Sequence, residues 1–215
     1  MRVGILAIQG AFRKHQDVLD RLEVSHQLVR QPADLTVDAL IVPGGESTTI
    51  TRVLQAEGWL ENIRQYAGSH PVFGTCAGAI LLGAQVDSEK VIPWNVIDMT
   101  LSRNAYGRQI NSFTGQVLMQ NHRKAHHIPA VFIRAPRILT TGPDVDILGT
   151  LQGDPVLVQY GLALASTFHP ELTVSTEVHR YFIENICRSA YSPAIRYTES
   201  VRQGDDNERD DPAGN

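Results

Sequence analysis

Apolar runs and amphipathic stretches alternate along the first part of the chain. The runs at residues 3–8, 26–29 and 39–42, and a fourth that begins at Pro71, have the length and composition of buried parallel strands. The alternation predicts an α/β fold with a doubly wound, mostly parallel sheet, flanked by helices and joined by right-handed crossovers. Helices are expected between the strands. Phe12, His15, Val18, Leu19 and Leu22 recur at helical spacing, Ile50, Val53 and Leu54 follow the expected N-cap residues Ser47 and Thr48, and a further helix is expected at 59–66.

The rest of the chain is less regular. Residues 98–101 alternate like an edge strand, and the polar stretch 102–109 is typical of a loop. Strands are expected at 114–119, 130–133 and 145–148, followed by a hairpin of 156–160 with 162–168 that turns at Gly161. A last amphipathic helix has Val178, Tyr181, Phe182, Ile186 and Cys187 on its inner side, which predicts a packing role for Cys187.

The strand that begins at Pro71 breaks at a cysteine between two glycines, in the sequence Gly74-Thr75-Cys76-Ala77-Gly78, and an apolar helix follows. A strand-turn-helix of this kind strains the backbone of its central residue and exposes that side chain above the sheet, and the glycines avoid clashes. The start of the helix favours a thiolate. The pattern predicts that Cys76 is a nucleophile; the alternative is a small core residue.

Glycine-containing turns end two other predicted strands, with Gln9-Gly10 after the first and Gly44-Gly45 after the third. In doubly wound sheets the site lies beyond the carboxyl ends of the strands, so we expect these turns to converge with Cys76. Attack of a thiolate on an amide carbonyl produces an oxyanion. We expect the Ala77 N–H and the 44–45 loop to stabilise that oxyanion.

A thiolate needs a base, and the base needs an acceptor that orients it. His169-Pro170-Glu171 follows the predicted hairpin. In extended backbone, residues two apart point to the same side, so the Glu171 carboxylate could hold the His169 imidazole. The alternative is a surface turn with a solvated glutamate. The glycine-flanked cysteine in a doubly wound sheet favours the catalytic interpretation.

Composition and charge narrow the class of protein. The length of 215 residues suits one domain, expected at 1–191, and the net charge of −4 equals that of the tail from Glu199 onward, with six acidic residues against two arginines. Residues 192–215 are expected to be a disordered acidic tail. Nothing indicates nucleic-acid binding, a signal peptide or a membrane span, and two distant cysteines suit the reducing cytoplasm.

The remaining histidines are assigned no chemistry. His122, His126 and His127 have a spacing that could place two imidazoles on one helical face, but Pro129 follows at once and no cysteine or paired acid is near, so no metal site is expected. His15, His26, His70 and His179 fall in predicted helices or loops, where a partly exposed side chain is the ordinary case.

Five segments together resemble one family, the glutaminase subunits of the ribose-5-phosphate-dependent pyridoxal 5'-phosphate synthase, which are triad-type, class I glutamine amidotransferases with a flavodoxin-like fold. The resemblance covers residues 3–186. Cys plus His-x-Glu is shared by many glutamine amidotransferases, and the combination with the other segments is specific to this family. The segments are Pro43-Gly44-Gly45-Glu46-Ser47-Thr48-Thr49, Gly74-Thr75-Cys76-Ala77-Gly78, Arg103-Asn104-Ala105-Tyr106-Gly107-Arg108-Gln109, Phe132-Ile133-Arg134-Ala135-Pro136 and Phe168-His169-Pro170-Glu171.

The resemblance implies a set of roles. Cys76 would be the nucleophile, with His169 and Glu171 as the charge relay, and Gln9-Gly10 would lie beside the oxyanion hole and rearrange when a partner docks. An arginine and a glycine-rich loop suit the carboxylate of a free amino acid. By the resemblance, the residues that line the L-glutamine site would be Gly45, Glu46, Ser47, Arg103, Ile133 and Arg134.

The resemblance also implies a partner, a (β/α)8-barrel synthase subunit that uses the ammonia to assemble pyridoxal phosphate, and no cofactor. The chain departs from the family at Asn95-Val96, where relatives often have Gly-Leu, at Ala79, and in the acidic tail. Two alternatives remain. One is the glutaminase subunit of another amidotransferase, such as imidazole glycerol phosphate synthase, and the other is a non-catalytic regulatory module.

Overall fold

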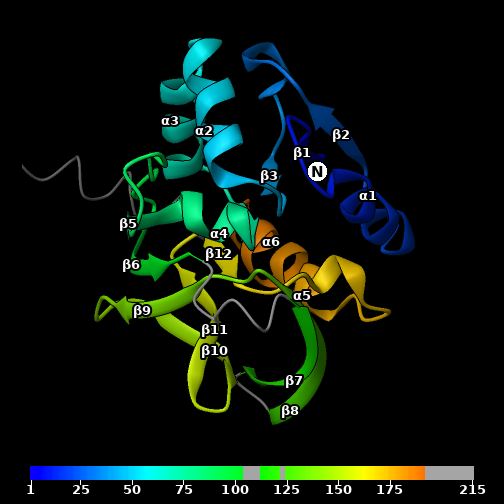
Figure 1. The fold of residues 1–215 in the computed structure, drawn as a ribbon. Helices are drawn as coiled ribbons and strands as arrows, with labels where there is room; N and C mark the ends of the chain where they lie inside the picture. The colour runs from blue at the N-terminus through cyan, green and yellow to red at the C-terminus, as the bar shows by residue number, and fades with distance from the viewer. Residues whose placement is uncertain (104–111, 122–123, 192–215) are drawn as a thin grey trace, which may run out of the picture.

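A nine-stranded sheet runs through the computed structural model, which describes residues 1–103, 112–121 and 124–191 (Figure 1). Counted across the sheet from one edge, the first five strands run parallel to one another. Each of the remaining four strands runs antiparallel to the strand before it. In spatial order the strands are β2 (His26–Val29), β1 (Val3–Leu6), β3 (Ala39–Val42), β4 (Val72–Thr75), β12 (Ala163–Ser166), β11 (Asp154–Tyr160), β10 (Asp146–Leu151), β7 (Ser112–Asn121) and β8 (Lys124–Ile133).

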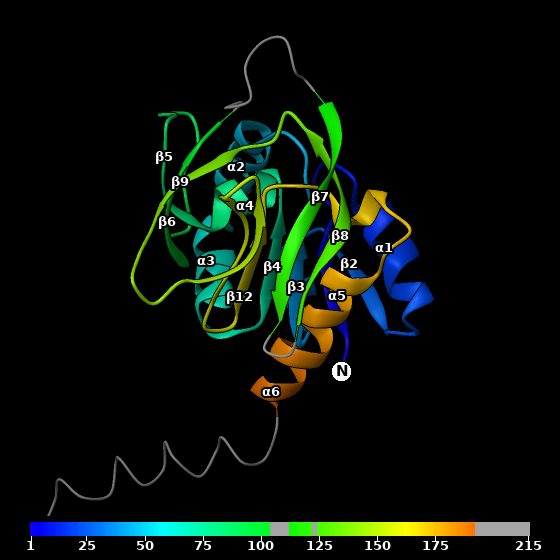
Figure 2. The ribbon, with the colours of Figure 1, turned by 90° about the horizontal axis from the view of Figure 1, so that it is seen from below.

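Helices cover both faces of the parallel half of this sheet (Figure 2). On one face lie α2 (Ser47–Ala56), α3 (Leu60–Ser69) and α4 (Ala77–Leu82), and on the other lie α1 (Phe12–Arg21) and α5 (Glu177–Tyr181). Successive residues of a strand point to opposite faces, so Leu40 and Val42 join one apolar core while Ile41 joins the other. The expected doubly wound α/β fold is confirmed.

A second, three-stranded sheet was only partly predicted. Residues 98–101 belong to β6 (Ile97–Ser102), which is the middle strand of this sheet and not an edge strand. Its neighbours are β5 (Gly83–Val86), which runs parallel to it, and β9 (Arg137–Thr141), which runs antiparallel. Both neighbours are short and partly exposed, so their sequences carry little of the apolar signal that predicts a strand.

The two long hairpins of the antiparallel half differ in how well the sequence predicts them. The hairpin of β11 and β12 is confirmed, and Gly161 turns it with a φ of +54°. The hairpin of β7 and β8 pairs Ser112 with Ile133 and is longer than the strands expected at 114–119 and 130–133. His126 and His127 therefore lie on a strand and not on a helical face. His122, the segment 104–109 and the tail 192–215 lie outside the described residues.

The C-terminal helix is continuous but not uniform. After α5 it passes through a π-helical segment (Phe182–Cys187) into α6 (Arg188–Ala190). Cys187 is fully buried, and burial raises the pKa of its thiol to about 12, as suits the packing role expected of it. Among the described helices, none is both long and apolar enough to span a membrane.

Close backbone packing fixes α4 against the sheet. A Cβ at Gly78 would lie 2.0 Å from the carbonyl oxygen of Val42, at the end of β3. A Cβ at Gly74 would lie 2.6 Å from the backbone of Gly78, so the two glycines of the turn pack against each other. Because the obstacles are backbone atoms, a side chain at either position forces the helix away from the strand.

We therefore expect Gly78→Ala to destabilise the protein by about 1–3 kcal/mol, the usual cost of overpacking a core. The matched control is Gly68→Ala, because Gly68 also lies in a helix and its added Cβ would meet no atom within 4 Å. There alanine should raise stability by up to about 1 kcal/mol. Chemical denaturation of both variants measures this difference, and equal stabilities would contradict the packing described here.

Candidate active site

Three neighbouring parallel strands end at the site. Leu40 of β3 pairs with Val72 of β4, and Ser166 of β12 pairs with Thr75 of β4, so the three strands reach the same edge of the sheet together. The segments that follow them carry Gly44, Cys76 and His169. Gln9 and Gly10, which follow β1, reach the same edge. The convergence predicted from the strand ends is confirmed.

Cys76 lies in the strained turn that the sequence predicts. Its φ is +49° and its ψ is −102°, a backbone conformation that residues other than glycine rarely adopt. Its N–H donates to the Ser166 carbonyl oxygen at 2.8 Å, which ties the turn to β12. The residue is 6% exposed, and α4 begins directly after it at Ala77. The sulfur therefore sits at the start of a helix, above the edge of the sheet.

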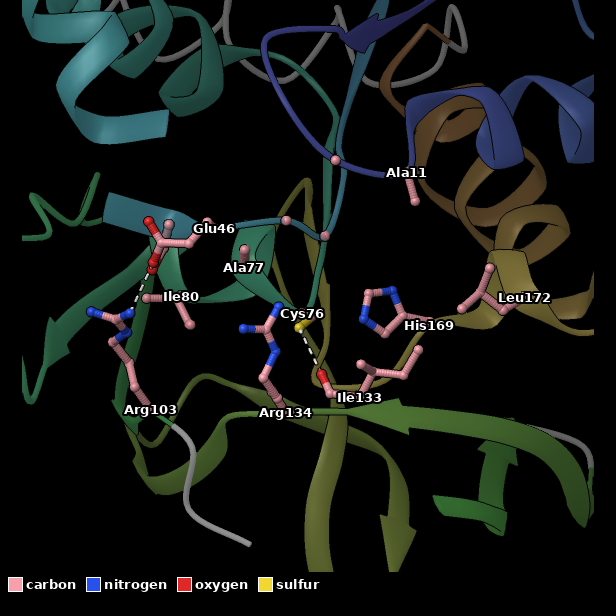
Figure 3. Close-up of a pocket in the computed structure, with 14 residues that line it drawn as sticks. Ala11, Glu46, Cys76, Ala77, Ile80, Arg103, Ile133, Arg134, His169 and Leu172 are labelled. Carbon is pink, nitrogen blue, oxygen red and sulfur yellow. Dashed lines mark hydrogen bonds and ion pairs between the residues drawn. The ribbon is translucent and has the colours of Figure 1, made fainter. Parts of the chain in front are cut away.

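His169 lies beside this sulfur (Figure 3). Its Nδ1 is 2.7 Å from Oε1 of Glu171. The other ring nitrogen, Nε2, is therefore the one that can form a hydrogen bond with Cys76. Burial lowers the pKa of His169, but hydrogen bonds with Cys76 and Glu171 outweigh burial and raise it to about 10. Gly44 makes room for the ring, since a Cβ there would lie 2.3 Å from His169 Cε1.

Glu171 reaches the imidazole by a different route from the one expected. The segment is not extended, because Pro170–Leu172 forms a 3₁₀ turn that His169 precedes. The turn brings the carboxylate back under the ring, and Glu171 is only 3% exposed. Burial opposes its ionisation, but the neighbouring His15 and the hydrogen bond from His169 outweigh burial and lower the pKa of Glu171 to about 2. The pairing predicted from the sequence is present, and the extended geometry was wrong.

The glycine-rich loop after β3 is held by the segment after β1. The Gln9 side-chain oxygen accepts from the Glu46 N–H at 2.6 Å, and the Ala11 N–H donates to the Gly44 carbonyl oxygen at 3.1 Å. A Cβ at Gly10 would lie 1.8 Å from that carbonyl oxygen, and its φ of +102° also favours glycine. Gly10, Gly45 and Ala77 all line the same pocket, and their role at an oxyanion stays a prediction.

Glu46 caps α2, in place of the expected Ser47 or Thr48. Its Oε2 accepts from the Thr49 N–H at 2.9 Å and from the hydroxyls of Thr48 and Thr49. Burial raises the pKa of Glu46, but these hydrogen bonds outweigh burial and lower it to about 2. Its other oxygen pairs with Arg103 Nη2 at 3.0 Å. The carboxylate is therefore charged and fixed at one end of the pocket.

The end of β8 forms the opposite wall. The His169 N–H donates to the Val131 carbonyl oxygen at 2.8 Å, which holds β8 against the site. Two residues on, the Ile133 carbonyl oxygen lies 3.7 Å from the Cys76 sulfur. Arg134 follows with a φ of +45°, and its guanidinium makes no ion pair with any residue that the structure describes.

These walls enclose a cavity of about 260 Å³ that the sulfur and the imidazole both face (Figure 3). All but two of the predicted site residues line it. Glu171 lies behind His169, and Gln9 reaches the loop through Glu46. The lining residues not predicted from the sequence are Ala11, Ile80 and Leu172; the predicted ones are Gly10, Gly44, Gly45, Glu46, Ser47, Cys76, Ala77, Arg103, Ile133, Arg134 and His169.

Two histidines of the site were assigned wrongly from the sequence. The sequence predicted partly exposed side chains for His15 and His179, but these residues are 0% and 1% exposed. His15 lies 3.6 Å from the Glu171 carboxylate, and His179 contacts the other side of the His15 ring. The signal was present for His15, which falls on the apolar face of its helix between Phe12 and Val18. A buried titratable residue on such a face needs a polar partner, and that partner comes from a distant part of the chain.

Two departures from the family pattern, at Asn95 and Ala79, fit the structure. Asn95 has a φ of +57°, the left-handed conformation that glycine adopts freely and that asparagine tolerates better than most residues. Ala79 is fully buried in the core beside α2 and α3. Within residues 1–103, 112–121 and 124–191, no group of three histidine, cysteine or acidic side chains is arranged to hold a metal ion.

Comparisons with known proteins identify the family of this chain. The model of the SNO glutamine amidotransferase family matches residues 5–188. The chain is 46% identical over 188 residues to the pyridoxal 5'-phosphate synthase subunit PdxT of Thermotoga neapolitana, covering 86% of this chain and 100% of that protein. The protein of the same name from Thermosipho africanus is 42% identical over 188 residues, with 86% and 99% covered.

A crystal structure of a glutamine amidotransferase shares this fold with a TM-score of 0.78 and 42% identity, over 85% of this chain and 97% of the other. The family model and the relatives both span the segments that carry Cys76, His169 and Glu171. The chain belongs to the SNO glutamine amidotransferase family.

Proposed function

We propose that this protein is the glutaminase subunit of a pyridoxal 5'-phosphate synthase. It hydrolyses L-glutamine to L-glutamate and ammonia, and it supplies the ammonia to a synthase subunit for vitamin B6 biosynthesis. The observation that carries the proposal is the pocket itself, in which a cysteine in a strained turn faces a histidine held by a buried carboxylate. The relatives that carry the synthase name match the chain over nearly their whole length.

The geometry supports a thioester mechanism. The Cys76 thiolate attacks the side-chain amide carbon of glutamine, and the Ala77 N–H with the Gly45 loop stabilises the oxyanion. The His169 imidazolium protonates the amide nitrogen, which leaves as ammonia when the carbon–nitrogen bond breaks. Water, deprotonated by His169, then attacks the thioester and releases glutamate and the thiolate. Glu171 keeps the imidazole oriented and stabilises its positive charge throughout.

The charges of the pocket suit a free amino acid. Arg103 is already paired with Glu46, whereas Arg134 makes no ion pair with a described residue. Arg134 is therefore the cation best placed to bind the α-carboxylate of glutamine, by charge-assisted hydrogen bonds. Arg103 instead orients Glu46 at the edge of the pocket, and hydrogen bonds to Asp87 and Ser88 hold Arg103 in place.

The proposed partner is a (β/α)8-barrel synthase subunit in a hetero-oligomer, and the proposed location is the cytoplasm. Ammonia is protonated in neutral water and then is no longer a nucleophile, so the product is useful only to a subunit docked at the pocket. The glutaminase subunit of another synthase is not favoured, because the relatives at 42–46% identity carry the pyridoxal phosphate name. A non-catalytic module would not need the charged His169–Glu171 pair.

Replacing the nucleophile separates the two halves of the reaction. In the complex with the barrel synthase, Cys76→Ala should lower glutamine-dependent pyridoxal phosphate formation by roughly a thousandfold or more, because no thioester can form. Added ammonium salt should restore synthesis. Cys187→Ala is the matched control, since that thiol is buried in the core away from the pocket. Glutamine-dependent synthesis that persists in Cys76→Ala would refute the assignment.

Substrate binding is tested at Arg134. Arg134→Gln should raise KM for glutamine by about ten- to a hundredfold with little change in kcat, because it removes charge-assisted hydrogen bonds to a group remote from the reacting amide. Arg137→Gln is the control, because Arg137 pairs with Asp154 at 3.0 Å and does not line the pocket. Steady-state kinetics of glutamate release measure both, and an unchanged KM in Arg134→Gln would exclude this role.

The imidazole of His169 should titrate near pH 10, well above an ordinary histidine. Because the folded pKa is raised, the stability that this group contributes is complete below pH 6.5 and is lost as pH rises through about 10. Glu171→Gln removes the charge that holds the proton, so the titration should move towards neutral pH. NMR of histidine-labelled protein measures it, with His169→Asn to assign the signal. A His169 signal that titrates near pH 6.5 in the unmodified protein would contradict the ion pair.

A further inference from the structure

Behind the carboxylate of Glu171 lie two buried histidines that the proposed mechanism does not use. His15 comes from α1 and His179 from α5, and their rings meet with centroids 5.2 Å apart. His15 Nδ1 is 2.9 Å from His179 Nε2, within hydrogen-bond distance. Burying two imidazoles is costly unless their nitrogens are paired, so the pair needs an explanation.

The second ring nitrogen of His15 faces the site. His15 Nε2 lies 3.6 Å from Oε1 of Glu171, the same oxygen that binds His169, and 3.3 Å from the Thr75 hydroxyl oxygen. Thr75 also accepts the Gly44 N–H at 2.9 Å, so this contact joins the His15 ring to the loop beside the nucleophile. The other oxygen of Glu171, Oε2, has no hydrogen-bond partner among the described residues. The polar contacts of this carboxylate are thus concentrated on Oε1.

Both histidines are neutral at physiological pH. Burial lowers the pKa of His15 by more than the Glu171 carboxylate raises it. Burial also lowers the pKa of His179, to about 3, and His15 adds to that effect. Among the described residues, the other titratable groups that act on this pair are Glu171 and His169 on the pocket side and Arg21 on α1. Each neutral ring carries one N–H, and the surroundings decide which nitrogen holds it.

The carboxylate selects the tautomer. With the proton on Nε2, His15 directs an N–H dipole at Glu171 and Thr75, and its Nδ1 accepts from His179 Nε2–H. His179 Nδ1, which has no partner among the described residues, is then a bare acceptor. The opposite arrangement would aim a lone pair at the carboxylate and leave a buried N–H without an acceptor, which costs more.

We propose that His15 is a positioning residue for the proposed glutaminase reaction: its Nε2–H dipole, 3.6 Å from Oε1, stabilises the charged Glu171 carboxylate behind His169, and His179 fixes the tautomer. The relay then runs inward from Cys76 through His169 and Glu171 to His15 and His179. Without the His15 ring, His169 is the one side chain among the described residues that still contacts Oε1. The carboxylate then orients the imidazole less well.

Two amide variants separate this role from simple packing. In His15→Gln the side-chain amide reaches the place of Nε2 and can still direct an N–H at Glu171 and Thr75, whereas in His15→Asn it reaches only the place of Nδ1. His15→Leu removes both contacts. The exposed His127→Leu is the control.

Glutamate release by the complex with the barrel synthase is measured for each variant, with thermal unfolding to confirm the fold. We expect His15→Leu and His15→Asn to lower kcat roughly tenfold or more, with KM changed less than twofold. NMR should show His169 titrating at a lower pH in both. His15→Gln should stay within a few-fold of the unmodified protein on each readout, and His127→Leu should match it.

The proposal is overturned if His15→Gln and His15→Asn are equally impaired, or if neither changes kcat or the His169 titration. If His15→Leu fails to fold, the comparison of the two amides decides. The NMR titration needs neither glutamine nor the partner. A protein that hydrolyses no glutamine would therefore refute the proposed function, while the His169 titration would still report whether His15 acts on the pair.

Discussion

The register of three parallel strands is the constraint on which the site depends. Because β3, β4 and β12 are neighbours and end together, the residues that follow them share one edge of the sheet. Cys76 and His169 are 93 positions apart in the numbering, and adjacent strands bring them into contact. A shift of one residue in either pairing would reverse the faces of the strands and separate the sulfur from the imidazole. The glycines at 74 and 78 allow the close backbone approach that this register needs, and Gly44 leaves room for the His169 ring.

A buried charge is the second constraint. Glu171 is 3% exposed, and an isolated carboxylate at that depth would take up a proton. Its neighbours His169 and His15 keep it ionised, and the charged carboxylate in turn favours the imidazolium of His169. The charges of Glu171 and His169 therefore stabilise each other. The buried carboxylate also needs polar neighbours on its inner side, where His15 of α1 and His179 of α5 lie. Catalysis and the packing of these two helices share the same contacts.

The sequence predicted most of the fold, and the failures have physical causes. The parallel strands, the turn at Cys76 and the hairpin at Gly161 were identified because apolar periodicity and glycine placement are local signals. The small sheet was only partly predicted, since β5 and β9 are short and partly exposed. The helix cap at Glu46 was missed because a glutamate caps through a longer side chain than the serine and threonine that follow it. The catalytic roles of Cys76, His169 and Glu171 stay predictions that their geometry supports.

What the sequence by itself determined is the set of chemical groups and the order of the elements: a cysteine between glycines, a histidine two residues before a glutamate, and strands that alternate with helices. The tertiary structure alone decided that Glu171 reaches His169 through a tight turn, that Arg103 is occupied by Glu46 while Arg134 faces the pocket, and that His15 is buried beside His179. The reason is distance along the chain. A local pattern specifies the conformation of a segment, but a buried polar contact depends on two segments whose sequences do not refer to each other.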